Sequence, residues 1–251
     1  MNLGGRNAIV TGGARGIGRA IAVALKAQGA RVSILGRDRD ALALACSSGA
    51  ADAFAACDVS DEAAIAEAVA RLAEPAPFDI AVANAGAVET APFLRTDASR
   101  FRRMIEVNLI GTSNLFAATL PAMTARGEGR LIAIASTAGH RGYAYVSAYA
   151  AAKHAVVGLV RSLAREVART GVTVNAICPG YTDTDLVAGS LAKIAAKTGK
   201  ATETALAELV KDNPQGRLIA PEEVAASVLH LCAPTSGAIN GQSILINGGE
   251  F

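Results

Sequence analysis

A strand-like run, a glycine-rich turn and a helical segment follow one another near the start of the chain, and this order restricts the fold more than any other feature. Residues 7–12 read Asn-Ala-Ile-Val-Thr-Gly, residues 12–18 contain four glycines, and residues 19–26 are typical of a helix. Glycines permit a tight turn and a close approach to a ligand, and the start of a helix offers unpaired amides to a pyrophosphate. A second strand-like run follows at 30–35, as dinucleotide binding requires. The alternative, a plain tight turn between core elements, leaves the glycine spacing unexplained.

Strand-like and helical segments alternate along all 251 residues without a linker, a proline-rich stretch or a charge run. Runs such as 131–135 are apolar on both faces, as in strands that helices cover on each side. We predict an α/β fold with one domain over residues 1–251, a single Rossmann-type doubly wound parallel sheet of about seven strands with helices on both faces. The expected strands cover residues 6–11, 31–36, 52–57, 79–84, 130–135, 172–178 and 242–246.

The composition excludes several classes of protein. The chain is 51% hydrophobic but has no apolar run approaching about eighteen residues, which indicates a large core and no membrane span. A net charge of +2 with dispersed basic residues argues against a nucleic-acid surface. The first strand begins almost at the N-terminus, so we expect a cytoplasmic protein without a signal sequence. Scattered cysteines without metal-ligand spacing indicate reduced core thiols and no metal site, namely Cys46, Cys57, Cys178 and Cys232.

Tyr149 and Lys153 lie four residues apart in an alanine-rich segment that is typical of a helix. Both side chains would share one face, where the ammonium would favour the phenolate and lower the pKa of Tyr149. Tyrosine and lysine at this spacing also occur by chance as solvated pairs. The interpretation therefore depends on the polar residues that end the predicted strands, which gather at one edge of such a sheet: Asp58, Asn84, Ser136, Pro179 and Gly180.

These motifs together resemble those of the short-chain dehydrogenases/reductases of ordinary length, over essentially the whole chain. Two departures are Ala83, where many relatives have asparagine, and Asn247, where many have aspartate. The resemblance implies a catalytic tetrad of Asn108, Ser136, Tyr149 and Lys153. The predicted cofactor contacts are Gly12, Arg15, Gly16, Ile17, Gly18, Arg37, Asp58, Val59, Asn84, Ala85, Gly86, Tyr149, Lys153, Pro179, Gly180, Thr182 and Thr184.

Each member of the tetrad has a role in carbonyl reduction. Tyr149 would donate the proton, and Ser136 would hold the carbonyl oxygen. The resemblance implies that Lys153 also binds the nicotinamide ribose and that Asn108 holds a water linking Lys153 to solvent. Two structural alternatives stay open: Ser136 as the cap of a strand end, and Asn108 as a hydrogen-bonding residue inside a helix.

The cofactor choice depends on the end of the second strand, where an acidic residue would favour NAD. That position is Gly36, and Arg37 and Arg15 could flank a 2′-phosphate. NADP is therefore favoured over NAD. Alternatively, both arginines are solvated, and Asp38 neutralises one of them.

Residues 184–214 follow the Pro179-Gly180 turn and are predicted to form a substrate lid. The lid and the segment after it resemble those of 3-oxoacyl and acetoacetyl thioester reductases and hydroxyacyl dehydrogenases, which suggests a β-keto thioester. A dehydrogenase of a small or cyclic secondary alcohol that uses NAD, and a non-catalytic nucleotide-binding regulatory protein, are the alternatives.

Two further groups of residues have predicted roles. His140, Arg141, Tyr143 and Tyr145 would line the substrate pocket, or else form exposed loop residues or subunit contacts. The helix around Tyr149 has an apolar face that we expect to point outward, which together with the resemblance predicts a homotetramer. That face consists of Ala148, Ala152, Val156, Leu159 and Leu163.

Overall fold

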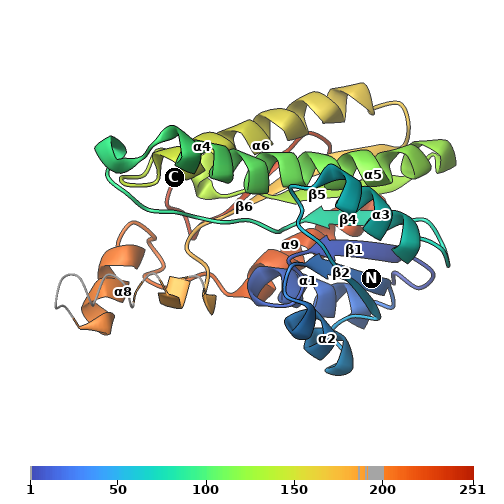
Figure 1. Cartoon of the computed structure of the whole chain (residues 1–251), viewed down its shortest axis with the longest axis horizontal. Helices are drawn as coiled ribbons and strands as arrows, with labels where there is room; N and C mark the ends of the chain where they lie inside the picture. Colours follow the sequence, from blue (N-terminus) through green and yellow to red (C-terminus); the bar gives the residue numbers. More distant parts are fainter. Residues whose placement is uncertain (1, 186, 190, 192–200) are drawn as a thin grey trace.

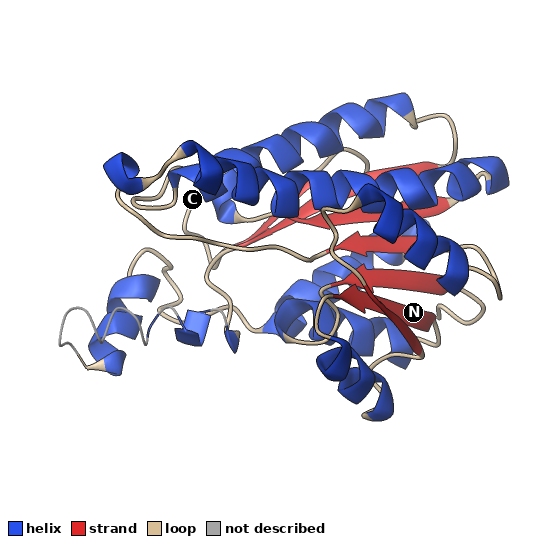
Figure 2. Ribbon diagram, in the orientation of Figure 1, coloured by secondary structure: helices blue, strands red, loops and turns tan. Residues whose placement is uncertain are grey.

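Seven parallel strands form one sheet at the centre of the computed structural model, which describes residues 2–185, 187–189, 191 and 201–251 (Figures 1 and 2). The strands are β1 (Asn7–Thr11), β2 (Arg31–Gly36), β3 (Ala53–Ala56), β4 (Ile80–Ala83), β5 (Gly129–Ile134), β6 (Val172–Pro179) and β7 (Ser243–Ile246). Their order is β3-β2-β1-β4-β5-β6-β7. Every predicted strand is confirmed to within one residue at each end. The order reverses between β1 and β4, and this switch point opens a crevice at the carboxyl ends of the strands.

Helices cover both faces of the sheet, as predicted. On one face α1 packs against α9, with α2 beside them, and on the other α3 packs against α5 and α4 against α6 (Figure 1). The first group is α1 (Gly16–Ala27), α2 (Arg39–Ser47) and α9 (Pro221–Cys232). The second group is α3 (Glu62–Leu72), α4 (Ala98–Ile105), α5 (Gly111–Arg126) and α6 (Ser147–Glu166).

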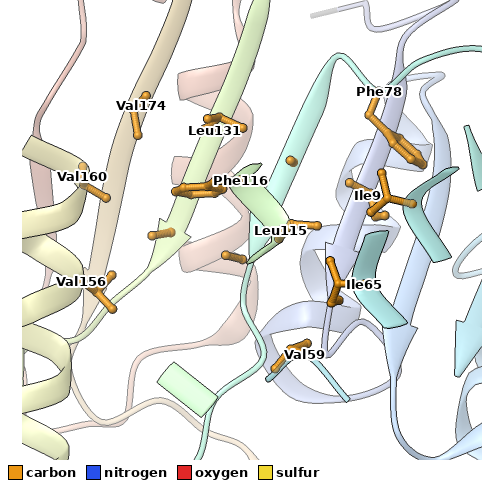
Figure 3. Packing of buried hydrophobic residues seen from close by; sticks show 14 of the residues in the cluster. Ile9, Val59, Ile65, Phe78, Leu115, Phe116, Leu131, Val156, Val160 and Val174 are labelled. Carbon is orange, nitrogen blue, oxygen red and sulfur yellow. The ribbon is translucent and has the colours of Figure 1, made fainter. Parts of the chain in front are cut away.

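Consecutive strand residues contribute to two separate apolar cores. Ile9 and Leu131 belong to the core under α3, α5 and α6, where Phe116 also packs (Figure 3). Val10 and Ile132 belong to the core under α1, α2 and α9. Because neighbouring side chains of a strand point to opposite faces, a doubly covered sheet needs apolar residues at nearly every strand position. This requirement explains why the strands have continuous apolar runs.

The face of α6 that we expected to point outward is largely buried within the chain, so that expectation was wrong. Ala148 and Ala152 pack against Met104 of α4, and Val156 lies in the core under α5 and α6. The sequence suggested too much apolar surface on α6 because it did not reveal that α4 covers part of it. This face therefore gives no support to the predicted homotetramer.

The predicted lid contains α8 (Thr202–Val210), which lies apart from the sheet (Figure 1). It has a small apolar cluster of its own, formed by Val187, Leu191, Ala205, Leu206, Leu209 and Leu218. Two apolar residues that we assigned to the lid, Leu186 and Ile194, lie outside the described residues. In the part of the chain that the structure describes, no helix is both long and apolar enough to cross a bilayer.

Candidate active site

The glycine loop ends at the first residue of α1, and the amides there have no capping side chain. Arg15 is the N-cap residue, has an extended backbone and makes no side-chain cap hydrogen bond, and the first turn has no acidic residue. Gly12 and Gly16 have φ angles of 65° and 51°, which favour glycine. Unpaired amides and the positive end of the helix dipole at Ile17 and Gly18 suit a pyrophosphate. The residues present therefore fit the dinucleotide that the sequence predicts.

The loop is packed so closely that a side chain at Gly12 or Gly18 would clash with its neighbours. A Cβ atom on Gly12 would lie 2.9 Å from Nδ2 of Asn84, and one on Gly18 would collide with the carbonyl oxygen of Gly12. A Cβ atom on Gly16 would lie 3.2 Å from Cγ2 of Thr184. Since Thr184 follows β6, the loop after β1 and the segment after β6 face each other across the crevice.

We expect Gly18→Ala to weaken NAD(P)H binding at least tenfold, because the added methyl group displaces the Gly12 carbonyl and the loop that presents the amides. Titration of the cofactor by fluorescence measures this effect. Gly237→Ala is the matched control, because its Cβ atom would make only an ordinary contact of 3.9 Å with the Pro234 carbonyl oxygen. Equal affinities for the Gly18 variant and the wild type would show that the loop does not hold the pyrophosphate.

Asn84 ties the end of β4 to the glycine loop. Its Nδ2 donates to the carbonyl oxygen of Thr11 at 2.9 Å, and the amides of Asn84 and Ala85 both donate to Oγ1 of Thr11, at 3.0 and 2.9 Å. These bonds fix the two strand ends on either side of the switch point. Asn84 alone is thus sufficient to connect these strand ends, although alanine stands at position 83, where many relatives have asparagine.

Three of the predicted cofactor contacts, Arg37, Asp58 and Val59, follow β2 and β3. Asp58 accepts hydrogen bonds from the amide and hydroxyl of Ser60, which lower its pKa, and lies 4.0 Å from Arg37. Arg15 pairs with Asp38 at 3.2 Å, and these two side chains are largely exposed. Arg15 is therefore the arginine that Asp38 neutralises, as in the alternative that we left open. Val59, next to Asp58, is buried.

Tyr149 and Lys153 lie in α6 beside the end of β5. The Nζ of Lys153 donates to the carbonyl oxygen of Ile134 at 2.9 Å and lies 5.7 Å from the centre of the Tyr149 ring. Lys153 is only 5% exposed, and burial lowers its pKa to about 8. The expected tyrosine and lysine pair is therefore assembled on one face of the helix.

The pKa of Tyr149 is raised, which contradicts our prediction that Lys153 would lower it. Burial of the phenol is the main cause, and a hydrogen bond with Ser136 acts in the opposite direction. Burial favours the neutral forms of both groups, because a charge is better solvated in water than inside the protein. Tyr149 is consequently a protonated phenol at neutral pH, the form that a proton donor requires.

Ser136 follows β5 and lies beside Tyr149. Its Oγ accepts from the amide of Ala138 at 3.1 Å, so Ser136 caps the 3-10 turn Thr137–Gly139 and not the end of a strand. Its hydrogen bond with Tyr149 joins two members of the predicted tetrad. The Ser136 hydroxyl thus caps a turn, and it also lies beside Tyr149, where it can contact the carbonyl oxygen of a substrate.

Asn108 lies in a short π-helical segment, Glu106–Ile110, between α4 and α5. It is 1% exposed, and its Nδ2 donates to the carbonyl oxygens of Met104 and Ala87. Its Oδ1 is buried with no hydrogen-bond partner among the described residues. A Cβ atom on Gly86 would lie 2.8 Å from this Oδ1 and 3.7 Å from Nζ of Lys153, so the two polar atoms flank the same point. That arrangement suits a bridging water.

The turn after β6 completes the crevice. Pro179 ends β6, and the amide of Gly180 donates to the Ile246 carbonyl oxygen at 2.9 Å. Thr182 is buried and donates to the carbonyl oxygen of Gly180, while Thr184 donates to that of Thr182. These bonds hold the turn beside the glycine loop.

The four residues predicted to line the pocket do not all lie in the same surroundings. His140 lies 3.5 Å from Sγ of Cys178, and burial lowers its pKa. Tyr145 is 65% exposed with φ of 67°, so the alternative of an exposed loop residue describes it and it does not line the cavity of Tyr143. Tyr143 lines a cavity that also contains Tyr181 and Glu250. Sequence reasoning missed Glu250, because no local pattern connects the last residues of the chain with residues 140–145.

Comparisons with known proteins agree with this geometry. The short chain dehydrogenase family matches residues 6–195. The chain is 39% identical to an acetoacetyl-CoA reductase of Rhizobium meliloti (strain 1021) over 98% of both proteins. It is 38% identical to a cis-4-hydroxycyclohexanecarboxylate dehydrogenase of Sinomonas cyclohexanicum over 97% of this chain and 96% of the other.

A solved structure of a single-residue variant of actinorhodin polyketide ketoreductase with NADPH is also similar. It superposes with a TM-score of 0.93 at 34% identity, over 98% of this chain and 97% of the other. Fold, motifs and comparisons lead to one assignment. The chain belongs to the short chain dehydrogenase family and is an oxidoreductase that acts on a CH–OH group with NAD(P).

Proposed function

We propose that the protein reduces a 3-oxoacyl (β-keto) thioester, or a related β-keto compound, with NADPH. The observation that carries this proposal is the meeting of Ser136, Tyr149 and Lys153 at the end of β5, on the crevice that the glycine loop borders. Similarity to an acetoacetyl-CoA reductase supports the choice of substrate.

The four tetrad residues would divide the work of carbonyl reduction. The nicotinamide cofactor, when bound, supplies the hydride. Tyr149 gives its phenolic proton to the carbonyl oxygen, and Ser136 donates a hydrogen bond to the same oxygen as charge develops there. Lys153 stabilises the phenolate that remains, because an ammonium nearby favours the charged form. The buried Oδ1 of Asn108 holds a water that returns a proton towards Lys153.

The preference for NADP rests on Arg37, which is largely exposed just after Gly36 at the end of β2. We expect Arg37→Asp to raise KM for NADPH at least tenfold and that for NADH no more than about twofold, because a guanidinium pairs strongly with a phosphate. Arg169→Asp, an equal charge change in an exposed position before β6, controls for net charge. Equal increases for both cofactors would contradict the assignment to NADP.

A second candidate is the dehydrogenation of a small or cyclic secondary alcohol with NAD. Two observations favour it: Asp38 already pairs with Arg15, and a cyclohexanecarboxylate dehydrogenase is nearly as similar as the reductase. Under this hypothesis NADH would be the better cofactor and cyclic ketones the better substrates.

The test is the loss of NADPH absorbance with a panel of β-keto thioesters and simple and cyclic ketones. Our proposal expects acetoacetyl-CoA to give the highest kcat/KM, and a cyclic ketone with NADH to be at least tenfold poorer. The reverse order would favour the second candidate, and no turnover with any compound would contradict both. The homotetramer and the cytoplasmic location stay predictions from the sequence, and light scattering tests the former.

A further inference from the structure

The last five residues, 247–251, fold back towards the segment that links β5 to α6. Gly248 and Gly249 have φ angles of 65° and 90°, and the amide of Gly249 donates to Oδ1 of Asn247 at 3.2 Å. The amide of Glu250 donates to the carbonyl oxygen of Asn247 at 3.3 Å. Two glycines in left-handed conformation thus form a tight turn that directs Glu250 inward.

The side chain of Glu250 is 6% exposed, and its carboxylate contacts two side chains of the linking segment. The hydroxyl of Tyr143 donates to its Oε1 at 2.7 Å, and Nη1 of Arg141 lies 3.4 Å from the same atom. The Arg141 guanidinium also lies 5.9 Å from the centre of the Tyr143 ring and 5.7 Å from that of Phe251. We name these four residues, Arg141, Tyr143, Glu250 and Phe251, the C-terminal clasp.

The clasp borders a cavity between the turn after β6 and the predicted lid. Tyr143 and Glu250 line a cavity of about 200 Å³ together with Gly180, Tyr181 and Leu209. The rings of Tyr143 and Tyr181 meet edge to face, with centres 6.5 Å apart. Tyr181 directly follows Pro179 and Gly180, which are two of the predicted cofactor contacts. The ring of Tyr143 is therefore one wall of a cavity that extends from the turn after β6 to α8.

We propose that Glu250 is a positioning residue that fixes the ring of Tyr143 and thereby shapes the cavity that receives the substrate. This inference rests on the proposed function, because it places the substrate in that cavity. A hydrogen bond from a phenol to a buried carboxylate is stronger than one between neutral groups. Without it, Tyr143 would gain rotational freedom, and each substrate molecule would have to order the ring again on binding.

The kinetic test uses acetoacetyl-CoA with NADPH or, if it is not turned over, the fastest ketone of the panel. Glu250→Ala should raise KM for the ketone about tenfold, while kcat and the KM for NADPH change less than about threefold. Glu250→Gln keeps an oxygen that accepts from Tyr143, so its KM should stay within about threefold of the wild type. Glu67→Ala, on the exposed side of α3, is the control for removal of a glutamate.

A double-mutant cycle tests the contact itself. Tyr143→Phe should raise KM for the ketone as much as Glu250→Ala does. The KM of the double variant should exceed that of either single variant by no more than about twofold. Tyr145→Phe removes the hydroxyl of a neighbouring exposed ring and should change nothing. An unchanged KM for Glu250→Ala in an enzyme that turns over would overturn the inference and leave the proposed function intact.

The same cycle in urea unfolding does not depend on turnover. We expect coupling between Glu250 and Tyr143 of at least about threefold in the unfolding equilibrium constant. Additive effects would overturn the clasp, whether or not the panel contains a substrate. Absence of turnover by the wild type, together with coupling, would contradict the proposed function alone.

Discussion

Tyr149→Phe should lower kcat/KM for ketone reduction about a thousandfold or more, with NADPH affinity unchanged within about threefold. General acid catalysis contributes roughly a hundredfold to ten-thousandfold, and phenylalanine keeps the ring but has no proton to give. The raised pKa of Tyr149 makes this prediction specific, since the phenol is fully protonated at neutral pH. Stopped-flow oxidation of NADPH gives the rate, and fluorescence titration gives the affinity.

Tyr145→Phe is the matched control for this loss, because Tyr145 is exposed and lies outside α6. Its kcat/KM should equal that of the wild type. If the Tyr149 variant kept more than about a tenth of the activity, another group would have to supply the proton.

Lys153→Met should abolish activity and, unlike most core substitutions, should stabilise the protein at neutral pH. Burial lowers the pKa of Lys153 from 10.5 to about 8, so at neutral pH its charge costs the folded state about 3 kcal/mol. Loss of the hydrogen bond to the Ile134 carbonyl oxygen offsets about 1 kcal/mol of the gain. The net gain of about 2 kcal/mol should raise Tm by about 4–8 °C.

The pH dependence of this gain has a defined sign. Below pH 8 the lysine is charged in both states, and the wild type bears the full cost of the buried charge. As pH rises from about 8 to 10.5, the folded state loses the proton before the unfolded state does, so the stability advantage of the variant should disappear. Lys26→Met, at a lysine whose side chain is 34% exposed and paired with Asp52, should instead lower stability slightly. If Lys153→Met were instead less stable than the wild type at pH 7, the prediction would be wrong. The contacts of the ammonium in the folded state would then outweigh the cost of burying its charge.

The sequence predicted the sheet well because the requirements of a doubly covered strand are local. Residues such as Ile9 and Val10 must both be apolar to serve two cores, and glycines mark the turn before α1. Local patterns also sufficed to predict the positions of Ser136, Tyr149 and Lys153. Ser136 follows a strand, and Tyr149 and Lys153 are four residues apart in a helix.

Features that depend on distant segments were not predictable from such patterns. The direction of the Tyr149 pKa depends on how deeply the phenol is buried, which spacing does not reveal. The burial of Ala148 and Ala152 depends on α4, more than forty residues earlier. The bond between Tyr143 and Glu250 joins residues 107 positions apart. Only the folded chain brings these groups together.

The most direct test of the central claim is the transfer of deuterium from NADPH in which both hydrogens at the nicotinamide C4 position are deuterium. We predict that the wild type places one deuterium on the carbinol carbon of the product from acetoacetyl-CoA, and that Tyr149→Phe, with the labelled cofactor bound, yields almost none. Mass spectrometry of the product distinguishes the outcomes. A product without carbon-bound deuterium from the wild type, or equal labelling by both proteins, would contradict hydride transfer coupled to a proton from Tyr149.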